Sequence, residues 1–518
     1  MSKSVVAGEA FGLATVSDSE SGSSWATARP LLLQVLVIGL VCAIPALLLA
    51  PFYHEPMSRD EGAYATVAQG LLHGQLPYRD LFDHKPPLVY VWYAASFVVF
   101  GETDAAPRFA GALFLSATAL LTFGIAKSLH GVRAGAFAGL AFSFSTGIVL
   151  LTPGFNTETF MLPMLVGSLA AYMAAIRRGG QRWYALSGIL GGLAVLTKSV
   201  AIWNLAFLGL ICLFRCWQSD RNRGASYLPL AAMVGGAVAS FLVVLAPFVL
   251  FGGAGEFIYA NVSYNSLYAR QEPATRVLLA DIWGLVALAN VAAPLVALCV
   301  LGSVAGIRRR VPAFWLIAGW SAASMLGALS TGHAFPHYYQ ALLPGFTLLV
   351  APLAEGLPVT TGRARVLCLA CLGIVVLLSV RTNVLLMESS SPSARMAVTE
   401  FSQETADRAL SNRAIGDYLA AQTDSGESIY NYGRESQIYF YASRRPAVRY
   451  FYDRPFWLDS ATLDETIAAL RVSLPAYIVD TGAGSLGDSY PPSYLALLND
   501  FYEYDRTVEY AKLFRLKD

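Results

Sequence analysis

Charged residues are scarce in this sequence. Only 14% of its 518 residues are Asp, Glu, Lys or Arg, whereas 55% are hydrophobic and the mean hydropathy is +0.51. Soluble domains carry about 25% charged residues, so the composition excludes an ordinary soluble protein and indicates a polytopic membrane protein with some extramembrane mass. The net charge of +1 gives no support for a nucleic-acid partner.

Cysteine is also rare, and the polar tail at the carboxyl terminus contains none. The six cysteines all lie within or at the ends of apolar runs: Cys42, Cys212, Cys216, Cys299, Cys368 and Cys371. The sequence therefore has no disulfide framework and no metal-ligand spacing of cysteines. The two pairs with helical spacing favour thiols packed between membrane helices over a binding site.

Long apolar runs, by contrast, fill most of residues 31–387. The first covers roughly 31–52, and later ones lie near 107–129, 132–152, 158–176, 183–197, 199–217, 227–251, 284–307, 313–331, 338–357 and 366–387. The run at 88–100 is much shorter, at about thirteen residues, whereas a full crossing needs about twenty.

Lys and Arg gather at every second junction between these runs. The basic junctions lie near 127–133, 177–182, 215–223, 308–310 and 363–365. The positive-inside rule places them in the cytoplasm, which requires residues 88–100 to form a re-entrant or interfacial helix. The pattern then predicts about 11 transmembrane helices (range about 11–13), with the amino terminus in the cytoplasm and the carboxyl terminus outside the cytoplasmic membrane.

Composition divides the chain into three parts. Residues 1–30 lack an apolar core and are expected to be a disordered cytoplasmic lead rather than a cleaved signal peptide. Residues 31–387 form the membrane region, in which residues 53–87 are an extracytoplasmic loop. After a linker near 387–392, residues 395–518 are expected to form an extracytoplasmic α/β domain. That domain has a helix around 414–419, short strands at 428–432, 448–452 and 476–480, and a closing edge strand at 508–516.

The polar segment Ser58–Pro87 stands out between the first two apolar runs. Ser58 and Glu61 fit a capping box, which starts a helix. Apolar residues then recur at helical spacing and predict an amphipathic helix in the membrane interface: Tyr64, Val67, Ala68, Leu71 and Leu72. Asp60 and Glu61 at its amino end either act only as cap and helix-dipole partners or carry chemistry.

Further charged residues lie on the same predicted side of the membrane. Lys85, followed by two prolines, either snorkels to the interface or binds a lipid phosphate. Glu158 is either a helix-start acid or a second carboxylate of a site. Lys198 interrupts an apolar stretch of over thirty residues, where a charge is costly and usually has a partner or a task.

A polar and aromatic cluster lies at the next outer junction. His333 and His337 are four residues apart, followed by Tyr338. Two such histidines can bind zinc, but Pro336 breaks the helix that would align them. Taken together, carboxylates and cations beside a lipid interface suit transfer from a phosphate-bearing lipid. A base would accept a proton from an acceptor hydroxyl, and cations would neutralise the departing phosphate.

These residues belong to an ordered set of motifs. In chain order they are Asp60-Glu61 with Tyr64, Pro77–Asp80, His84–Leu88, Pro107–Leu113, Asn156–Glu158, Gly192–Lys198, and His337–Tyr339 with Leu342–Pro344. The set resembles bacterial membrane glycosyltransferases with the GT-C fold, in the protein-mannosyltransferase superfamily. Within it, the chain looks most like lipid A aminoarabinose transferases and lipopolysaccharide galacturonosyltransferases. The resemblance covers about residues 31–357.

The resemblance implies a polyprenyl-phosphate monosaccharide as donor and transfer with inversion outside the cytoplasmic membrane. It implies that Asp60 is the catalytic acid and that Lys85 contacts the lipid phosphate, with Arg270 from the second outer loop as a further candidate. Supporting roles are expected for Glu61, Tyr64, Glu158, Lys198, His333, His337 and Tyr338. Membrane lipids and an envelope glycan, lipid or protein acceptor are the expected partners. Neither a cofactor nor a divalent metal is expected.

Two departures from the family pattern, and two other functions, remain open. The family often has Arg-Thr-Asp where this chain has Asn156–Glu158, and Glu where this chain has His84. The second departure suggests a subgroup with a different donor or without a metal ligand there. A transporter or flippase of lipid-linked sugars is the main alternative, but it predicts repeated halves and broken midplane helices, which the sequence does not suggest. A non-catalytic assembly protein is the third.

Overall fold

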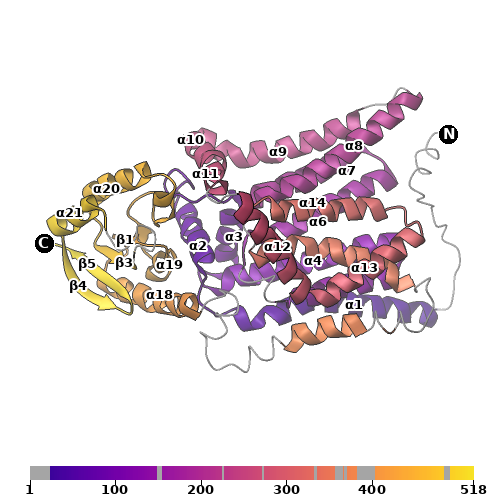
Figure 1. Cartoon of the computed structure of the whole chain (residues 1–518), viewed down its shortest axis with the longest axis horizontal. Helices are drawn as coiled ribbons and strands as arrows, with labels where there is room; N and C mark the ends of the chain where they lie inside the picture. The colour runs from indigo at the N-terminus through magenta and orange to yellow at the C-terminus, as the bar shows by residue number, and fades with distance from the viewer. Residues whose placement is uncertain are drawn as a thin grey trace.

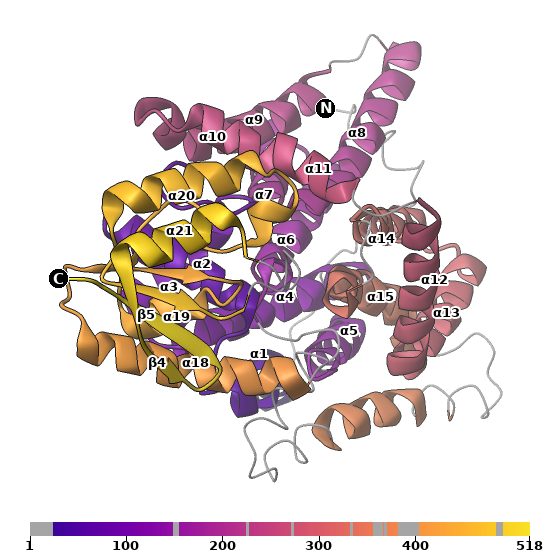
Figure 2. The ribbon, with the colours of Figure 1, turned by 60° about the vertical axis from the view of Figure 1, so that its left-hand side comes forward.

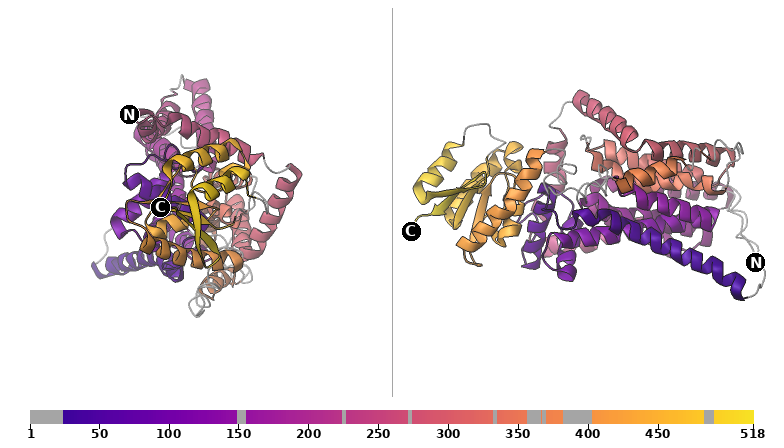
Figure 3. Two further views of the ribbon diagram at one scale, coloured as in Figure 1. Left: turned by 90° about the vertical axis from the view of Figure 1, so that its left-hand side faces the viewer. Right: turned by 90° about the horizontal axis from the view of Figure 1, so that it is seen from below.

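The computed structural model consists of two parts that follow one another along its long axis (Figure 1). One part is a bundle of helices with roughly parallel axes, and the other is a small sheet domain with helices around it. The view from below shows the same division (Figure 3, right). The structure describes residues 24–148, 155–223, 227–270, 274–331, 335–355, 366, 370–381, 403–482 and 490–518.

Five helices in the described part of the chain are long and apolar enough to cross a membrane. They are α1 (Ser24–Leu49), α4 (Ala105–His130), α6 (Thr157–Arg178), α8 (Ile202–Arg223) and α9 (Leu228–Leu250). Shorter helices pack beside them: α3 (Leu88–Phe100), α5 (Val132–Ser145), α7 (Gln181–Thr197), α14 (Phe314–Leu329) and 370–381. The chain is therefore a multi-span membrane protein.

Two of the predicted apolar runs are not single helices. The run near 284–307 divides between α12 (Ala274–Val291) and α13 (Ala293–Arg308), because Pro294 lies in the first turn of α13 and cannot continue the preceding helix. The run near 338–357 consists of the 3₁₀ helix η6 (Pro336–Leu342), the short helix α15 (Leu343–Val350) and a second 3₁₀ helix, η7 (Ala351–Glu355). Both corrections concern helix continuity, which hydropathy does not report.

Short elements gather at the end of the bundle that faces the sheet domain (Figure 1). Between α1 and α3 lie the 3₁₀ turn η2 (Ala50–Phe52) and α2 (Arg59–Leu72). Between α9 and α12 lie α10 (Ala254–Ile258), the π-helical turn η5 (Tyr259–Tyr264) and α11 (Asn265–Ala269). A 3₁₀ turn, η4 (Ser199–Ala201), joins α7 to α8.

The carboxyl-terminal domain is a mixed five-stranded sheet in the order β2-β1-β3-β5-β4. Strands β1 (Ser428–Tyr432), β2 (Arg445–Pro446) and β3 (Tyr477–Asp480) are parallel, whereas β4 (Tyr502–Val508) and β5 (Ala511–Leu516) form an antiparallel hairpin on the other side of β3. The helices of the domain are α18 (Gln403–Gln422), α19 (Gln437–Ala442), the 3₁₀ helix η8 (Arg454–Trp457), α20 (Ala461–Ser473) and α21 (Pro492–Phe501).

The sequence predicts this domain only in part. The helix around 414–419 and the strands at 428–432 and 476–480 are confirmed as α18, β1 and β3. The predicted strand at 508–516 is confirmed as β5, but its predicted edge position is wrong, since β5 lies inside the sheet and β4 forms the edge. The predicted strand at 448–452 is also wrong. Its backbone pairs outside the sheet instead, where Arg449 O accepts a hydrogen bond from Phe82 N at 2.9 Å.

Helix α2 lies between the membrane helices and the sheet domain (Figure 2). It begins, as predicted, with a capping box in which Ser58 and Glu61 satisfy each other's backbone amides. The predicted position in the membrane interface does not describe all of the surroundings of α2, because one face of the helix packs on α3 and another packs on α19. A Cβ on Gly62 would clash with the backbone of Gln437, so the two helices can approach closely only at a glycine.

Candidate active site

The polar residues singled out from the sequence lie where the helical bundle meets the sheet domain. They come from α2, from the loop between α2 and α3, from the amino end of α6, from the α7–η4 junction and from η6. These segments are far apart in the sequence, and the antiparallel packing of the bundle brings their ends to one side. Glu61, the first of them, is a structural residue.

Glu61 is 1% exposed and holds three segments together. Its carboxylate accepts hydrogen bonds from Ser58 N at 2.8 Å and Phe155 N at 3.3 Å, and pairs with the guanidinium of Arg108 at 3.2 Å. Burial would raise the pKa of Glu61, but Arg108 and the capping bonds lower it below its usual value. Sequence reasoning missed Arg108, although it lies in the Pro107–Leu113 motif.

Replacing Arg108 with leucine is expected to destabilise the protein by about 3–5 kcal/mol, because a buried carboxylate loses its cation. Arg108 also donates to the backbone carbonyls of Phe52, Glu55 and Pro56, which would lose their donor. Thermal unfolding of the detergent-purified protein measures the effect. The double variant Glu61→Leu/Arg108→Leu should lose less stability than Arg108→Leu alone, and an equal or larger loss in the double variant would contradict this account.

Asp60, in contrast, is exposed in the first turn of α2. Its negative charge acts on the ammonium group of Lys85 and stabilises it. Burial would lower the pKa of Lys85, but Asp60, with a further contribution from Asp83, raises that pKa above its usual range. The backbone around Lys85 is held in place, since its carbonyl accepts hydrogen bonds from Tyr78 Oη at 2.7 Å and Tyr90 Oη at 3.3 Å.

A second group of charges lies beside this pair. Lys198, at the carboxyl end of α7, forms an ion pair with Glu158 and lies over the ring of Tyr338, 4.0 Å from its centroid. His337 Nε2 lies 3.9 Å from Glu158 Oε1, and burial lowers the pKa of His337, which favours a neutral ring. The expected partner of Lys198 is therefore Glu158. Both Asp60 and Lys85 act electrostatically on His337 and Tyr338, so the two groups form one cluster.

Asp83 is a site residue that sequence reasoning missed. It is 3% exposed and accepts hydrogen bonds from Tyr90 Oη at 2.9 Å, from the backbone N of His84 at 2.7 Å and from Tyr452 Oη at 3.0 Å. Tyr452 belongs to the sheet domain, which also contributes the bond from Arg449 Nε to Tyr78 O at 2.8 Å. No motif in the tail signals these contacts, because they depend on how the two parts pack.

The outer loop between α9 and α12 contacts the same segment from another direction. Asn265 Nδ2 donates to His84 O at 2.9 Å, and the rings of Tyr264 and Tyr268 lie 5.4 Å from the His84 ring. Residues 82–85 are thus held by the sheet domain and by the outer loop together. The position of Lys85 is therefore fixed by groups outside its own segment.

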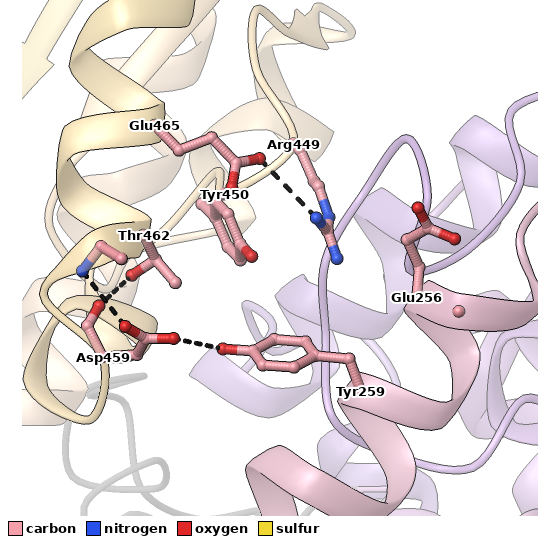
Figure 4. A pocket seen from close by; sticks show the side chains of 9 residues that line it. Glu256, Tyr259, Arg449, Tyr450, Asp459, Thr462 and Glu465 are labelled. Atoms are coloured by element: carbon pink, nitrogen blue, oxygen red, sulfur yellow. Dashed lines mark hydrogen bonds and ion pairs between the residues drawn. The ribbon is translucent and has the colours of Figure 1, made fainter.

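A cavity of about 290 Å³ lies next to this loop, between η5 and the sheet domain (Figure 4). Tyr259 points across it and donates to Asp459 Oδ2 at 3.0 Å, while Arg449 lies 3.6 Å from Glu465. The ring of Phe82 packs against both Tyr259 and Tyr450 of its wall. The cavity therefore adjoins the segment that carries Lys85, although none of the residues predicted from the sequence lines it.

Comparisons with known proteins give one family match. The profile of the dolichyl-phosphate-mannose-protein mannosyltransferases matches residues 84–251. The matched segment includes Lys85, Glu158 and Lys198, and it begins after Asp60. No curated protein matches the chain by sequence.

Solved structures show the fold of the chain. ArnT from Cupriavidus metallidurans bound to undecaprenyl phosphate has a TM-score of 0.59 and 17% identity, over 93% of this chain and 97% of ArnT. The same protein in the apo state has a TM-score of 0.60 and 16% identity, over 94% of this chain and 98% of ArnT. The chain therefore has the GT-C fold of ArnT, including its carboxyl-terminal domain.

The remaining residues predicted from the sequence lie outside the cluster or outside the described residues. Tyr64 is buried and packs edge-on against Tyr90 and Tyr93, with ring centroids 6.3 and 5.5 Å away. Arg270 is exposed at the carboxyl end of α11 and forms no ion pair with a described residue of the cluster. His333 lies outside the described residues. Within the described part of the chain, no three His, Cys, Asp or Glu side chains gather as a metal site would require.

Replacing Asp83 with asparagine is expected to lower stability by about 1.5–3 kcal/mol, because charged hydrogen bonds to the sheet domain are lost. Burial raises the pKa of Asp83, but His84 and then Lys85 outweigh it and depress the folded value. A carboxyl whose pKa is lower in the folded state than in the unfolded state stabilises the fold at every pH above its unfolded pKa, which is about 3.9. The carboxyl loses this effect only as the pH falls through its pKa in the folded state.

The difference in melting temperature between wild type and Asp83→Asn should therefore be the same at pH 7 and pH 9, and should shrink only below about pH 4. Tyr452→Phe serves as the matched control, with the same pH profile and a smaller loss, because it removes one donor and leaves the carboxylate. A difference that changes between pH 7 and pH 9 would show that another group controls the contact.

Proposed function

We propose that the enzyme transfers a monosaccharide from a polyprenyl-phosphate donor to an envelope glycan, lipid or protein acceptor, with inversion at the anomeric carbon. The observation that carries the proposal is an exposed carboxylate, Asp60, that acts electrostatically on a lysine held in its charged form, Lys85, at one end of the membrane helices. The solved ArnT structure of the same fold, which holds undecaprenyl phosphate, supports a lipid phosphate as the donor's leaving group.

In this mechanism Asp60 accepts the proton of the acceptor hydroxyl while the hydroxyl oxygen attacks the anomeric carbon. The bond between that carbon and the phosphate oxygen breaks at the same time, and the electron pair stays with the lipid phosphate. Lys85 stabilises the negative charge that develops there. A single displacement from the face opposite the phosphate inverts the anomeric configuration.

The neighbouring residues have supporting roles in the proposal. The ion pair of Glu158 with Lys198, together with Tyr338 and His337, forms a wall of the site with little net charge, so that Lys85 remains the main cation for the phosphate. Arg270 is a second candidate for the phosphate. It follows Tyr268 by two residues, and Tyr268 acts electrostatically on Lys85. Glu61 and Tyr64 support the position of α2.

The proposed topology has about 11 spans, with residues 1–30 in the cytoplasm and residues 395–518 and the loop at 53–87 outside the cytoplasmic membrane. The direction of the helices supports it. Helix α1 begins at the end of the bundle away from the sheet domain (Figure 1), and α6 ends there with Arg177 and Arg178 in its last turn. Basic helix ends on one side and the sheet domain on the other fit the positive-inside rule.

The test is a transfer assay with the purified full-length protein in proteoliposomes. A panel of polyprenyl-phosphate sugars is supplied on the side of the sheet domain, together with envelope glycolipids, glycans and proteins as acceptors. We expect release of polyprenyl phosphate and a new glycoside of inverted configuration. Movement of the lipid-linked sugar across the bilayer without transfer would overturn the proposal in favour of a flippase.

A further inference from the structure

Two arginines of the sheet domain converge on one tryptophan. Arg434 follows the carboxyl end of β1, and Arg454 begins η8, which ends at Trp457. The guanidinium carbon of Arg434 lies 4.4 Å from the centroid of the Trp457 ring, and that of Arg454 lies 5.3 Å from it. Trp457 itself is 37% exposed, so the ring keeps an accessible area beside two positive charges.

Neither guanidinium has a carboxylate partner at hydrogen-bond distance among the described residues. Arg434 Nε is buried without an acceptor, and its closest carboxylate oxygen, Asp453 Oδ1, lies 3.8 Å away. Arg454 forms no ion pair in the described part of the chain, and lies instead over the ring of Tyr268 at 5.3 Å. A guanidinium carries five donors in a fork that fits an oxyanion, so unused donors on two adjacent arginines indicate a missing anionic ligand.

The local charges agree with this geometry. Burial lowers the pKa of Arg434 and the attraction of Asp453 opposes that effect; the positive charges of Arg454 and Arg59 lower the pKa further, and Glu435 raises it. Because Glu435 already binds Arg59, the repulsion that an anion would relieve is the one between Arg434 and Arg454. The side chain of Arg434 is 31% exposed, so an anion can reach it.

The arginine pair lies between the two halves of the proposed reaction site. Glu435, next to Arg434, binds Arg59 through two hydrogen bonds of 3.0 and 3.2 Å, and Arg59 directly precedes Asp60. On the other side, the Tyr268 ring that Arg454 covers lies 5.4 Å from the ring of His84, the residue before Lys85. A group bound at Arg434 and Arg454 is therefore close to the proposed base.

We propose that Arg434, Arg454 and Trp457 form a second oxyanion site, which binds a phosphate or carboxylate group of the acceptor while the acceptor hydroxyl faces Asp60. The proposal rests on the proposed function and narrows its acceptor to an acidic glycan or glycolipid. Trp457 packs against the sugar ring that carries the acidic group, and the two guanidiniums bind the group itself. Lys85 remains the site of the donor phosphate.

Binding to the full-length protein in detergent tests the proposal without turnover. The probes are glucose 6-phosphate, glucuronate, unmodified glucose, inorganic phosphate and undecaprenyl phosphate, each measured by calorimetry or thermophoresis. We expect glucose 6-phosphate or glucuronate to bind at least tenfold more tightly than glucose. The Arg434→Gln/Arg454→Gln variant should lose at least tenfold of that affinity and keep wild-type affinity for undecaprenyl phosphate. The Lys85→Gln variant should lose affinity for undecaprenyl phosphate and keep wild-type affinity for the acidic sugar.

A matched control comes from two other arginines of the same domain. Arg471 and Arg515 are exposed, but each has a carboxylate at hydrogen-bond distance, Asp500 at 3.2 Å and Glu503 at 2.8 Å. Arg471→Gln/Arg515→Gln should leave all affinities unchanged. The conservative Arg434→Lys/Arg454→Lys variant should recover part of the binding, which a merely misfolded domain would not.

Four outcomes would overturn the proposal. They are equal affinity for glucose and its acidic analogues, unchanged affinity in Arg434→Gln/Arg454→Gln, tighter binding of inorganic phosphate than of either acidic sugar, and loss of undecaprenyl phosphate binding in that variant. The last would assign the arginines to the donor. Failure of the proposed function is separate, because it would appear as absent sugar transfer by the wild-type enzyme whatever the sugar phosphate affinity.

Discussion

Asp60→Asn is expected to reduce sugar transfer by about 10²- to 10⁴-fold, since an amide cannot accept the proton of the acceptor hydroxyl. The loss should fall on kcat, because the donor phosphate is held by Lys85 and not by Asp60. The measurement is single-turnover transfer by purified protein in proteoliposomes, with donor binding measured in parallel. Retention of fold is checked by thermal unfolding, and because Asp60 is exposed, its replacement should change the stability little.

The matched control for Asp60→Asn is Asp464→Asn. Asp464 is also an exposed acid in the first turn of a helix, here α20, and it lies outside the proposed site. Its replacement should leave transfer within twofold of wild type. Transfer by Asp60→Asn at the wild-type rate would remove Asp60 from the mechanism, and the carboxylate of Glu158 would then have to be tested as the base.

Lys85→Gln is expected to lower kcat by about 10²- to 10³-fold, because the charge of the departing phosphate loses its fixed cation. The KM for the donor should also rise, since the same cation binds the phosphate in the ground state. Lys85→Arg keeps the charge and should retain part of the activity, whereas Lys512→Gln, an exposed lysine on β5, should retain all of it.

The pH profile separates this role of Lys85 from proton transfer. Because Asp60 raises the pKa of Lys85 above its usual range of about 10.4, the ammonium group stays charged throughout the neutral and alkaline range. The pH at which kcat/KM falls on the alkaline side should therefore be the same in wild type and in Lys85→Arg. If this fall occurred at a higher pH in Lys85→Arg, Lys85 would titrate during the reaction.

The sheet domain is part of the site in this structure, and not a separate module on a linker. Tyr452 binds Asp83, Arg449 binds the backbone of Tyr78 and Phe82, and Glu435 binds Arg59 beside Asp60. The residues that hold the two proposed catalytic groups therefore come from the membrane region and from the tail together. Loss of the tail should misplace Lys85 even where the membrane helices remain folded.

Local sequence patterns determined where most of the helices lie along the chain. Apolar runs marked most of the membrane helices, the shortness of the run at 88–100 set α3 apart, and the capping box located the start of α2 at Arg59. Such features depend on residues within one or two helical turns, so the sequence carries them directly. The candidates Asp60, Lys85, Glu158 and Lys198 were also recognisable, because charges next to apolar runs are costly without a partner or a task.

Only the tertiary structure decided which of those charges face one another. Asp60 and Glu61 are adjacent in the sequence, but one turns to the exposed site and the other to Arg108 inside the protein, because side chains one residue apart project about 100° apart around a helix. Glu158 and Lys198 pair across two helices, and Asp83 acquires a partner from Tyr452, 369 residues away. Contacts of this kind depend on the packing of whole elements, which no local pattern records.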